Sequence, residues 1–249
     1  MEAIRRAADL LRGRGSVVVL TGAGVSAESA VPTFRDAMTG LWARYDAERL
    51  ATPGAFGRDP ALVSRWYDER RQRVLGCEPN AAHLALAEWQ RSCSERGVGF
   101  TLLTQNVDRL HQRAGSEDVV ELHGSLLVWR CTKSGRERTD LPAPLPHYPM
   151  PSEAGGIYRP GVVWFGEALP EAALARARAA LASCDAVVSI GTSAVVQPAA
   201  SFVLVARAHG AAAVEVNREP TPISGAVDVS VQGLAGEIVP ELVRLLQEP

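Results

Sequence analysis

The first residues with a clear chemical use follow the earliest apolar run of the chain. Residues 21–27 read TGAGVSA, a G-x-G-x-x-A pattern directly after the strand-like run 16–20. Glycines at these positions let backbone N–H groups approach the phosphates of a dinucleotide. The competing interpretation is a tight turn between a strand and a helix. Dehydrogenases carry a strand and an acidic residue about twenty positions further on. Here residues 39–42 read TGLW, so a dinucleotide would not bind in the dehydrogenase manner.

Polar side chains recur where other strand-like runs end. Residues 104–108 read TQNVD, residues 121–124 read ELHG, residues 191–193 read GTS, and Asn217 follows another run. The carboxyl ends of parallel strands meet at one edge of a sheet, where ligands bind. Hydroxyl and amide groups at this edge suit ribose and phosphate. His123 could accept a proton near neutrality, although an isolated histidine is more often a buried group bonded to a carbonyl.

The elements that must position these residues alternate along the chain. Segments with helical character lie at residues 2–13, 79–96, 106–114, 170–183, 197–209 and 236–247. Short β-branched runs, typical of strands buried on both faces, lie at residues 16–20, 100–103, 119–122, 162–165, 186–190, 213–216 and 227–231. Strands that alternate with helices predict an α/β fold with a Rossmann-like, doubly wound parallel sheet.

Two stretches break this alternation. Residues 32–78 contain no strand-like run and are partly helical, and residues 124–160 are rich in proline with little periodicity. Structureless loops of this length are unusual in a compact domain. We therefore expect the two insertions to build a smaller second lobe. The predicted division is a Rossmann-like domain at 1–31, 80–123 and 161–249 and a small lobe at 32–79 and 124–160.

The composition excludes some classes of function. The 249 residues have a formal net charge of −2, with 47% hydrophobic and 22% charged residues. This balance gives no general reason to bind nucleic acid or an anionic membrane. No apolar run approaches the roughly 20 residues of a membrane span, and the first residues lack a signal peptide. We expect a cytoplasmic protein whose four cysteines are free thiols, and Lys133 is the only lysine.

The ordered motifs resemble those of the sirtuin family, the NAD-dependent protein lysine deacylases. The resemblance runs from about residue 16 to residue 240 and implies NAD as the cofactor and acylated lysine side chains of proteins as substrates. The matching segments are 22–26 (GAGVS), 32–35 (PTFR), 104–108 (TQNVD), 122–124 (LHG), 159–167 (RPGVVWFGE), 191–193 (GTS) and Asn217.

The resemblance implies roles for individual residues. His123 matches the general base, and Asn106 is the second catalytic residue. Val163, Trp164, Phe165 and Gly166 match a strand that pairs with the substrate backbone. The residues that match the NAD site are Gly22, Ala23, Gly24, Ser26, Phe34, Arg35, Gln105, Asn106, Asp108, Gly191, Thr192, Ser193, Asn217, Arg218 and Ala235.

The implied reaction requires a base. In this family the acyl oxygen attacks the ribose carbon that bears nicotinamide, and a ribose hydroxyl is then deprotonated to attack the resulting imidate. His123 would accept that proton. The products would be nicotinamide, the deacylated lysine and 2'-O-acyl-ADP-ribose.

A further pair of residues bears on the acyl group. Residues 65–71 read RWYDERR, so Tyr67 and Arg70 share one face of a helix. This pair, with the upstream segment 50–53 (LATP), resembles the marker of the desuccinylase and demalonylase branch. A guanidinium can bind a terminal carboxylate bidentately while a phenol donates one more bond. The competing interpretation is a solvated helix face formed by Arg70, Arg71 and Arg73 with Asp68 and Glu69.

One segment departs from the family. Most sirtuins bind structural zinc through two C-x-x-C pairs, but here the corresponding residues 131–134 read CTKS and 151–154 read PSEA. A closed zinc site needs four ligands. We therefore expect no zinc and no other metal, with the lobe held by apolar packing and its prolines.

Three functions stay open at this point. The first is a lysine deacylase, either a desuccinylase and demalonylase with weaker deacetylase activity or a plain deacetylase. The second is a mono-ADP-ribosyltransferase, and the third is a non-catalytic module that binds NAD or ADP-ribose. The mass of an acylated peptide after incubation with NAD distinguishes them, because it falls, rises or stays constant.

Overall fold

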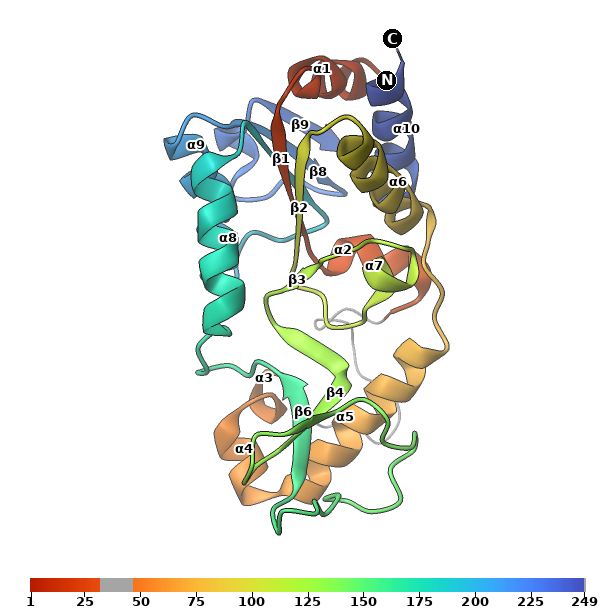
Figure 1. The fold of residues 1–249 in the computed structure, drawn as a ribbon, viewed down its shortest axis with the longest axis vertical. Helices are drawn as coiled ribbons and strands as arrows, with labels where there is room; N and C mark the ends of the chain where they lie inside the picture. The colour runs from red at the N-terminus through yellow and green to blue at the C-terminus, as the bar shows by residue number, and fades with distance from the viewer. Residues whose placement is uncertain (32–46, 249) are drawn as a thin grey trace.

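The computed structural model describes residues 1–31 and 47–248, which form a larger and a smaller lobe along one long axis (Figure 1). The larger lobe is built on a six-stranded parallel sheet of order β3-β2-β1-β7-β8-β9, which confirms the predicted α/β fold. The order reverses between β1 and β7, and ligands of open α/β sheets bind at such a switch point. The strands are β1 (Ser16–Thr21), β2 (Gly99–Thr104), β3 (Val120–Glu121), β7 (Ala186–Ile190), β8 (Ala212–Asn217) and β9 (Val229–Gln232).

Helices cover both faces of this sheet. Val17 and Val19 of β1 pack on one side, whereas Val18 and Leu20 pack on the other. Successive side chains of a strand point to opposite faces, so a strand covered on both sides is apolar throughout. The helices are α1 (Glu2–Leu11), α6 (Ala81–Glu95) and α10 (Ala235–Gln247) on the first side and α8 (Glu171–Ser183) and α9 (Phe202–Ala208) on the second.

Shorter helices complete the larger lobe. α2 (Ala23–Ser26) follows β1 and α7 (Leu110–Arg113) follows β2, while 3-10 segments lie at Ala27–Ser29, Ala199–Ser201 and Ser224–Ala226. Within residues 1–31 and 47–248, no helix has both the length and the apolar character needed to cross a bilayer.

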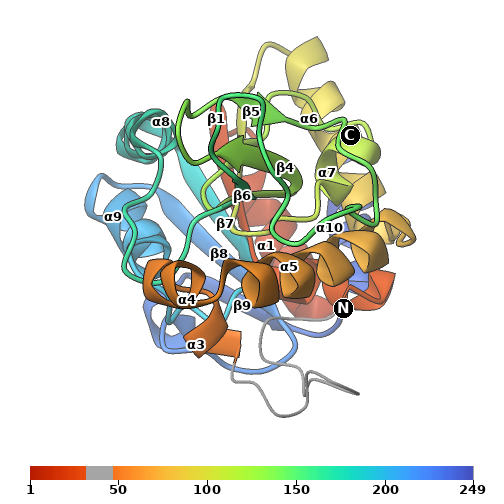
Figure 2. The same ribbon diagram turned by 90° about the horizontal axis from the view of Figure 1, so that it is seen from below.

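The smaller lobe combines the two insertions. The first contributes α3 (Ala47–Leu50), α4 (Pro53–Arg58) and α5 (Pro60–Leu75). The second contributes an antiparallel sheet of β5 (Glu137–Arg138), β4 (Gly124–Cys131) and β6 (Tyr158–Val162), and α5 lies against β4 and β6 (Figure 2). The core of this lobe is aromatic, since Trp66, Trp129, Tyr158 and Trp164 are nearly inaccessible to solvent.

The predicted strand at residues 162–165 is wrong in both place and sheet. The strand is β6, which ends at Val162 and pairs antiparallel with β4 in the smaller lobe. Residues 164–167 form a turn, in which the Glu167 N–H donates to the Trp164 carbonyl at 2.9 Å and Gly166 has a φ of 86°. The apolar run reflects burial of Trp164 in the aromatic core, and an apolar run looks the same in either setting. The expected domain boundary between residues 160 and 161 therefore falls inside β6.

Strand β4 has no counterpart among the predicted elements. Its pairing with β6 shifts register between Ser125 and Trp129, so its buried positions do not alternate regularly. An irregularity of this kind removes the period-two pattern by which a strand is recognised in a sequence.

A buried ion pair ties α5 to the proline-rich segment of the second insertion. Asp68 and Arg71 are 0% and 3% exposed, with 2.6 Å between Oδ1 and Nη2. Arg71 donates to the Pro142 carbonyl at 2.5 Å, and Asp68 Oδ2 accepts the Leu145 N–H at 2.8 Å and the Tyr148 hydroxyl at 2.5 Å. The solvated-face interpretation is therefore wrong for Asp68 and Arg71.

At the tip of the smaller lobe, Cys131 is the centre of a hydrogen-bonded turn. Its Sγ lies 3.0 Å from the Ser152 hydroxyl and accepts the N–H groups of Lys133 and Ser134 at 3.4 Å. The Lys133 side chain is exposed beside this turn. Among the residues that the structure describes, no cluster of three His, Cys, Asp or Glu side chains could hold a metal. The absence of zinc stays a prediction.

Candidate functional site

A cleft of about 1070 Å³ lies between the two lobes, at the carboxyl ends of the parallel strands. This volume is sufficient for a small-molecule ligand. The predicted site residues that line it are Gly22, Ala23, Gly24, Ser26, Gln105, Asn106, Asp108, His123, Gly191, Thr192, Ser193, Asn217 and Arg218 from the larger lobe and Tyr67, Arg70, Val163, Trp164, Phe165 and Gly166 facing them.

The remaining predicted residues lie elsewhere. Phe34 and Arg35 fall outside the described residues. Ala235 begins α10, is buried, and is not among the residues that line the cleft. Its predicted contact with the cofactor stays a prediction.

The glycines at the switch point allow two loops to cross at backbone distance. The Gly24 N–H donates to the Gly191 carbonyl at 2.8 Å. A Cβ at Gly22 would lie 2.8 Å from the Gly191 carbonyl oxygen, and a Cβ at Gly24 would lie 2.8 Å from the Gly191 Cα. Any side chain here would separate the loops. The floor of the cleft is therefore bare backbone to which a phosphate group can come close, while the N–H groups of Gly22 and Gly24 are themselves bonded to the carbonyls of Ile190 and Gly191.

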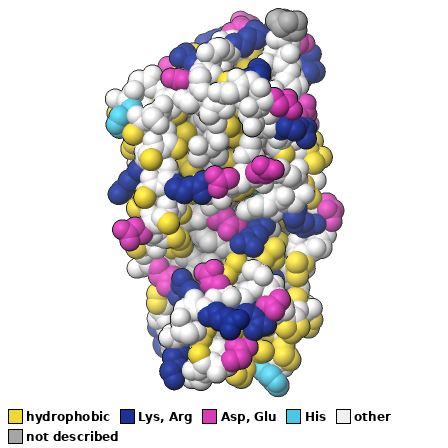
Figure 3. All heavy atoms as spheres, in the orientation of Figure 1, with side chains coloured by type: hydrophobic (Ala, Val, Ile, Leu, Met, Phe, Trp, Pro, Cys, Tyr) yellow, Lys and Arg dark blue, Asp and Glu magenta, His cyan; other side chains and the backbone are white. Residues whose placement is uncertain are grey.

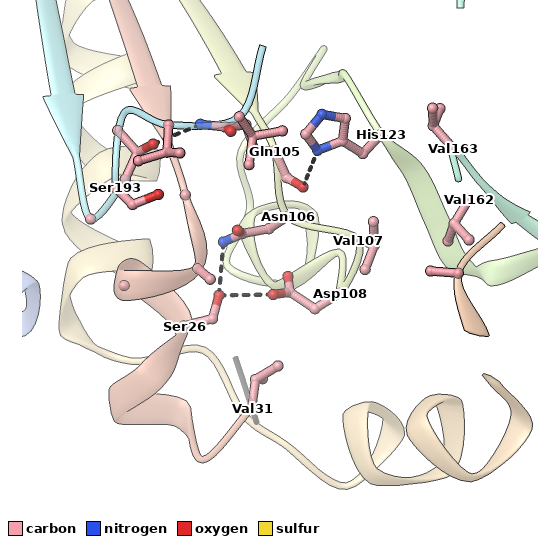
Figure 4. A pocket seen from close by; sticks show the side chains of 18 of the residues that line it. Ser26, Val31, Gln105, Asn106, Val107, Asp108, His123, Val162, Val163 and Ser193 are labelled. Carbon is pink, nitrogen blue, oxygen red and sulfur yellow. Dashed lines mark hydrogen bonds between the residues drawn. The ribbon is translucent and has the colours of Figure 1, made fainter. Parts of the chain in front are cut away.

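His123 is prepared to accept a proton. Its Nδ1 lies 3.0 Å from the Gln105 carbonyl oxygen (Figure 4). A carbonyl can only accept, so Nδ1 carries the proton and Nε2 keeps its lone pair. Burial lowers the pKa of His123 below its ordinary value, and the bond to Gln105 offsets part of this effect. The imidazole is therefore a neutral base at physiological pH.

Ser26 organises the polar groups beside His123. Its hydroxyl donates to Asp108 Oδ2 at 2.8 Å and accepts from Asn106 Nδ2 at 3.0 Å (Figure 4). Burial raises the pKa of Asp108, while hydrogen bonds from Leu110 and Ser26 oppose that effect. Because the amide nitrogen of Asn106 is turned toward Ser26, its amide oxygen is the end of the side chain that remains for a ligand.

Two buried histidines, His83 and His111, lie behind Ser26 and Asn106, and no role is predicted for them from the sequence. His83 Nε2 lies 3.3 Å from Ser26 Oγ, and His111 Nε2 lies 2.9 Å from Thr21 Oγ1. Their ring centroids are 4.8 Å apart. Burial lowers the pKa of His83 to about 4 and that of His111 to about 3, so both are neutral. One signal for His83 was available, because it follows the helix cap Asn80 by three residues in a capping box.

The smaller lobe presents Tyr67 and Arg70 to the same cleft. Tyr67 is 5% exposed and its ring lies 6.3 Å from that of Trp164, while the Arg70 guanidinium lies 5.0 Å from the ring of Trp66. Burial raises the pKa of Tyr67, so its hydroxyl stays protonated and can donate. A guanidinium and a phenol are both donors that suit an anionic group.

The segment predicted to pair with substrate already uses its N–H groups. The Val163 N–H donates to the His123 carbonyl at 2.9 Å, the Trp164 N–H to Glu167 Oε2 at 2.9 Å, and the Phe165 N–H to the Ala51 carbonyl at 2.9 Å. A substrate backbone would have to pair with carbonyl groups of this segment or displace these bonds. Strand addition here stays a prediction.

The charges on the visible face of the molecule are mixed. Basic and acidic side chains are interspersed with apolar ones in Figure 3. This distribution agrees with the small formal net charge of −2.

Comparison with known proteins gives consistent matches along the chain. The sequence model of the Sir2 family matches residues 22–198. NAD-dependent protein deacylase 1 of Pseudomonas aeruginosa is 51% identical, with 97% of this chain and 98% of that protein covered. NAD-dependent protein deacylase 1 of Archaeoglobus fulgidus is 49% identical, with 92% and 91% covered.

Solved structures agree with the sequence matches. The crystal structure of a Sir2 homologue in complex with NAD superposes with a TM-score of 0.88 and 45% identity, covering 97% of this chain and 93% of the other. A Sir2 structure with a p53 peptide and NAD+ gives a TM-score of 0.84 at 30% identity, covering 97% of both chains.

Proposed function

The chain belongs to the Sir2, or sirtuin, family and is an NAD-dependent protein deacylase, and on that premise we propose that it prefers acyl groups that end in a carboxylate. Succinyl-lysine and malonyl-lysine would be better substrates than acetyl-lysine. The observation that carries this proposal is the pair Tyr67 and Arg70, which lines the same cleft as His123.

The residues of the cleft fit the chemistry of NAD. Bound NAD supplies the ribose carbon to which the acyl oxygen is transferred as nicotinamide leaves. The pyrophosphate would lie against the bare backbone at Gly22 and Gly24, and the Asn106 amide oxygen would face the nicotinamide end. His123 Nε2 would take the proton of a ribose hydroxyl, because its Nδ1–H is committed to Gln105.

The acyl preference follows from the donors on α5. A carboxylate can accept two parallel bonds from the Arg70 guanidinium and a third from the Tyr67 hydroxyl. Each charge-assisted bond contributes about 1.5–3 kcal/mol, or roughly ten- to a hundredfold in preference. An acetyl group ends in a methyl group, and its carbonyl oxygen is the reacting atom, so it offers no terminal acceptor to either residue.

The test compares kcat/KM for succinyl-lysine and acetyl-lysine versions of one peptide. We expect the wild type to favour the succinyl peptide by about tenfold or more. Arg70→Met should abolish this preference while acetyl-lysine turnover stays within about threefold of wild type, and Tyr67→Phe should weaken it while the ring is kept. Arg65→Met is the control, because Arg65 is exposed on the same helix and does not line the cleft.

Two results would contradict the proposal. A wild type that deacylates both peptides equally well would have no preference for an acyl group that ends in a carboxylate, and one that favours the acetyl peptide would be a plain deacetylase. A preference that survives Arg70→Met would assign the acyl pocket to other residues.

A further inference from the structure

A chain of buried hydroxyl groups runs beneath Asn106. The Asn106 N–H donates to Thr104 Oγ1 at 3.0 Å, and the Thr21 hydroxyl donates to the same oxygen at 2.9 Å. Thr21 and Thr104 face each other across the pair of strands β1 and β2 and are 0% and 2% exposed. Thr21 ends β1 at the switch point and Thr104 ends the adjacent β2, and the residues that follow them, Gly22 and Gln105, line the cleft.

The chain ends on His111. Because the Thr21 hydroxyl gives its proton to Thr104, its oxygen must accept from His111, whose Nε2 lies 2.9 Å away. His111 is therefore the Nε2–H tautomer. Its Nδ1 is buried and has no hydrogen-bond partner among residues 1–31 and 47–248.

The unpartnered Nδ1 argues against a purely structural role for His111. A buried polar atom without a partner destabilises the fold, whereas an apolar side chain would fill the same space without that cost. What an apolar side chain cannot supply is the Nε2–H bond to Thr21. The one contact that requires an imidazole is thus the bond from His111 to Thr21, and this bond begins the series of hydrogen bonds that leads through Thr104 to Asn106.

Asn106 is held from two directions as a result. Its side-chain amide nitrogen bonds to Ser26, and its backbone N–H bonds to Thr104. The first bond sets the orientation of the amide, and the second fixes the backbone where the chain leaves β2. Displacing a reacting or orienting group by even about 1 Å can lower a rate by about a hundredfold.

We infer that His111 is a positioning residue for the NAD reaction, acting through Thr21 and Thr104 to hold Asn106 in place beside the bound nicotinamide ring. The inference rests on the proposed role of Asn106 in the nicotinamide end of the cleft and is independent of the acyl preference. It extends the functional site by a residue that contacts no ligand.

The experiment uses three variants of the full chain. His111→Gln keeps an N–H donor near the position of Nε2, His111→Leu removes it at similar volume, and Thr21→Val removes the next hydroxyl. For each variant, kcat, the KM values for NAD and for the acyl peptide, and the exchange of labelled nicotinamide into NAD are measured. The peptide carries whichever acyl group the wild type uses best.

We expect His111→Leu and Thr21→Val each to lower kcat and nicotinamide exchange by about tenfold or more, with the KM for the acyl peptide unchanged. The double variant should be no slower than either single variant, because both cut one chain. His111→Gln should recover to within about threefold of wild type. The matched control is Val239→Ala, a buried position of α10 away from the cleft, which should lower the Tm and leave kcat unchanged.

Three results would overturn the inference. The first is nicotinamide exchange at the wild-type rate in His111→Leu. The second is an equal loss of kcat in His111→Gln and His111→Leu. The third is a loss of kcat in Val239→Ala in proportion to the fall in its Tm. The ratio of succinyl to acetyl turnover should not change in any of these variants. A failed acyl preference and a failed role for His111 are therefore read from different measurements.

Discussion

The hydrogen bond between His123 and the Gln105 carbonyl determines which nitrogen of the ring can react. It places the proton on Nδ1 and leaves Nε2 as the acceptor. Because burial lowers the pKa of His123, the neutral form persists to a more acidic pH than in a free histidine. The group is thus ready as a base over the whole neutral range.

Replacing this base should separate catalysis from binding. We expect His123→Ala to lower turnover by about a hundredfold or more while NAD binding and the Tm stay close to wild type. For the wild type, kcat/KM should stay flat above neutrality and fall as the pH drops through the lowered pKa of His123. The exposed His209 is the control, since His209→Ala should change neither quantity. Deacylation at the wild-type rate by His123→Ala would remove the assignment.

At this scale, the sequence predicts residues at strand ends and misses residues behind them. Gln105, Asn106 and His123 directly follow strands, where polar residues are expected to meet a ligand. His83 and His111 lie on helices, where a buried polar side chain occupies the same positions as an apolar one. Their connection to Ser26 and Thr21 joins α6 and α7 to the end of β1 and to α2, which are distant in sequence, and no local pattern records it.

At the scale of the element, α5 combines two functions on different sides of one helix. Tyr67 and Arg70 line the cleft, while Asp68 and Arg71 anchor the helix to the proline-rich segment. The position of the proposed acyl site therefore depends on an ion pair that contacts no ligand.

Breaking this pair should cost far more stability than breaking an exposed one of equal spacing. Arg71→Ala leaves the buried Asp68 carboxylate without its cation, which should lower the free energy of unfolding by about 3–5 kcal/mol. Arg244→Ala breaks the exposed pairs with Glu241, also three residues away, and with Glu248, and should lower the free energy of unfolding far less. Urea denaturation of both variants measures the difference. Equal losses would show that burial of the Asp68–Arg71 pair does not matter.

The same helix shows why element type is easier to predict than environment. Two opposite charges three residues apart look the same in a sequence whether they are buried or exposed. Arg71 and Asp68 are buried, at 3% and 0% exposed. The segment 162–165 shows the converse, because apolar residues predicted a strand in the parallel sheet where a turn packs Trp164 into the smaller lobe. Both errors concern the partner of a segment, which only the tertiary structure supplies.

For the molecule as a whole, the smaller lobe should fold without metal. Hydrogen bonds around Cys131 and Ser152 occupy the place where the family's cysteine pairs would stand, and the aromatic core supplies apolar contact. The described residues hold no cluster of three metal-ligating side chains, so we expect no metal-binding free energy to be coupled to folding. Purified protein should hold well under one equivalent of zinc, and a chelator should leave the Tm unchanged. Stoichiometric zinc would show that other residues form a site.

Acid should weaken the fold before the carboxylates titrate. The unfolded chain binds protons on His83 and His111 near pH 6.5, whereas burial lowers their pKa to about 4 and about 3 in the folded state. Stability is therefore fully present above pH 6.5 and is lost as the pH falls. Between pH 7.5 and pH 5, each histidine should lower the free energy of unfolding by about 2 kcal/mol. Urea denaturation at the two pH values measures this change. An unfolding free energy that is constant between these two pH values would exclude the neutral, buried state of both rings.

The parallel sheet and its flanking helices follow from periodicity, and the strand ends of the site follow with them. The packing inside the smaller lobe does not, because residues 47–75 and 124–162 are far apart in the sequence and no local pattern records which of their side chains form its core. Matching motifs of a known family predicted residues that line the cleft from both lobes. Reasoning from single segments predicted the residues at the strand ends of the larger lobe, but it did not predict which residues of the smaller lobe face them.

The scarcity of lysine has a consequence for the protein's own chemistry. Reactive acyl thioesters modify amines, and a guanidinium, which stays protonated, is not such a nucleophile. Lys133, exposed at the tip of the smaller lobe beside the Cys131 turn, is the only side-chain amine of the chain. Exposure to succinyl thioester should therefore add no more than one side-chain acyl group, which intact mass would register. An enzyme that removes acyl marks from other proteins thus offers almost no surface on which to acquire them.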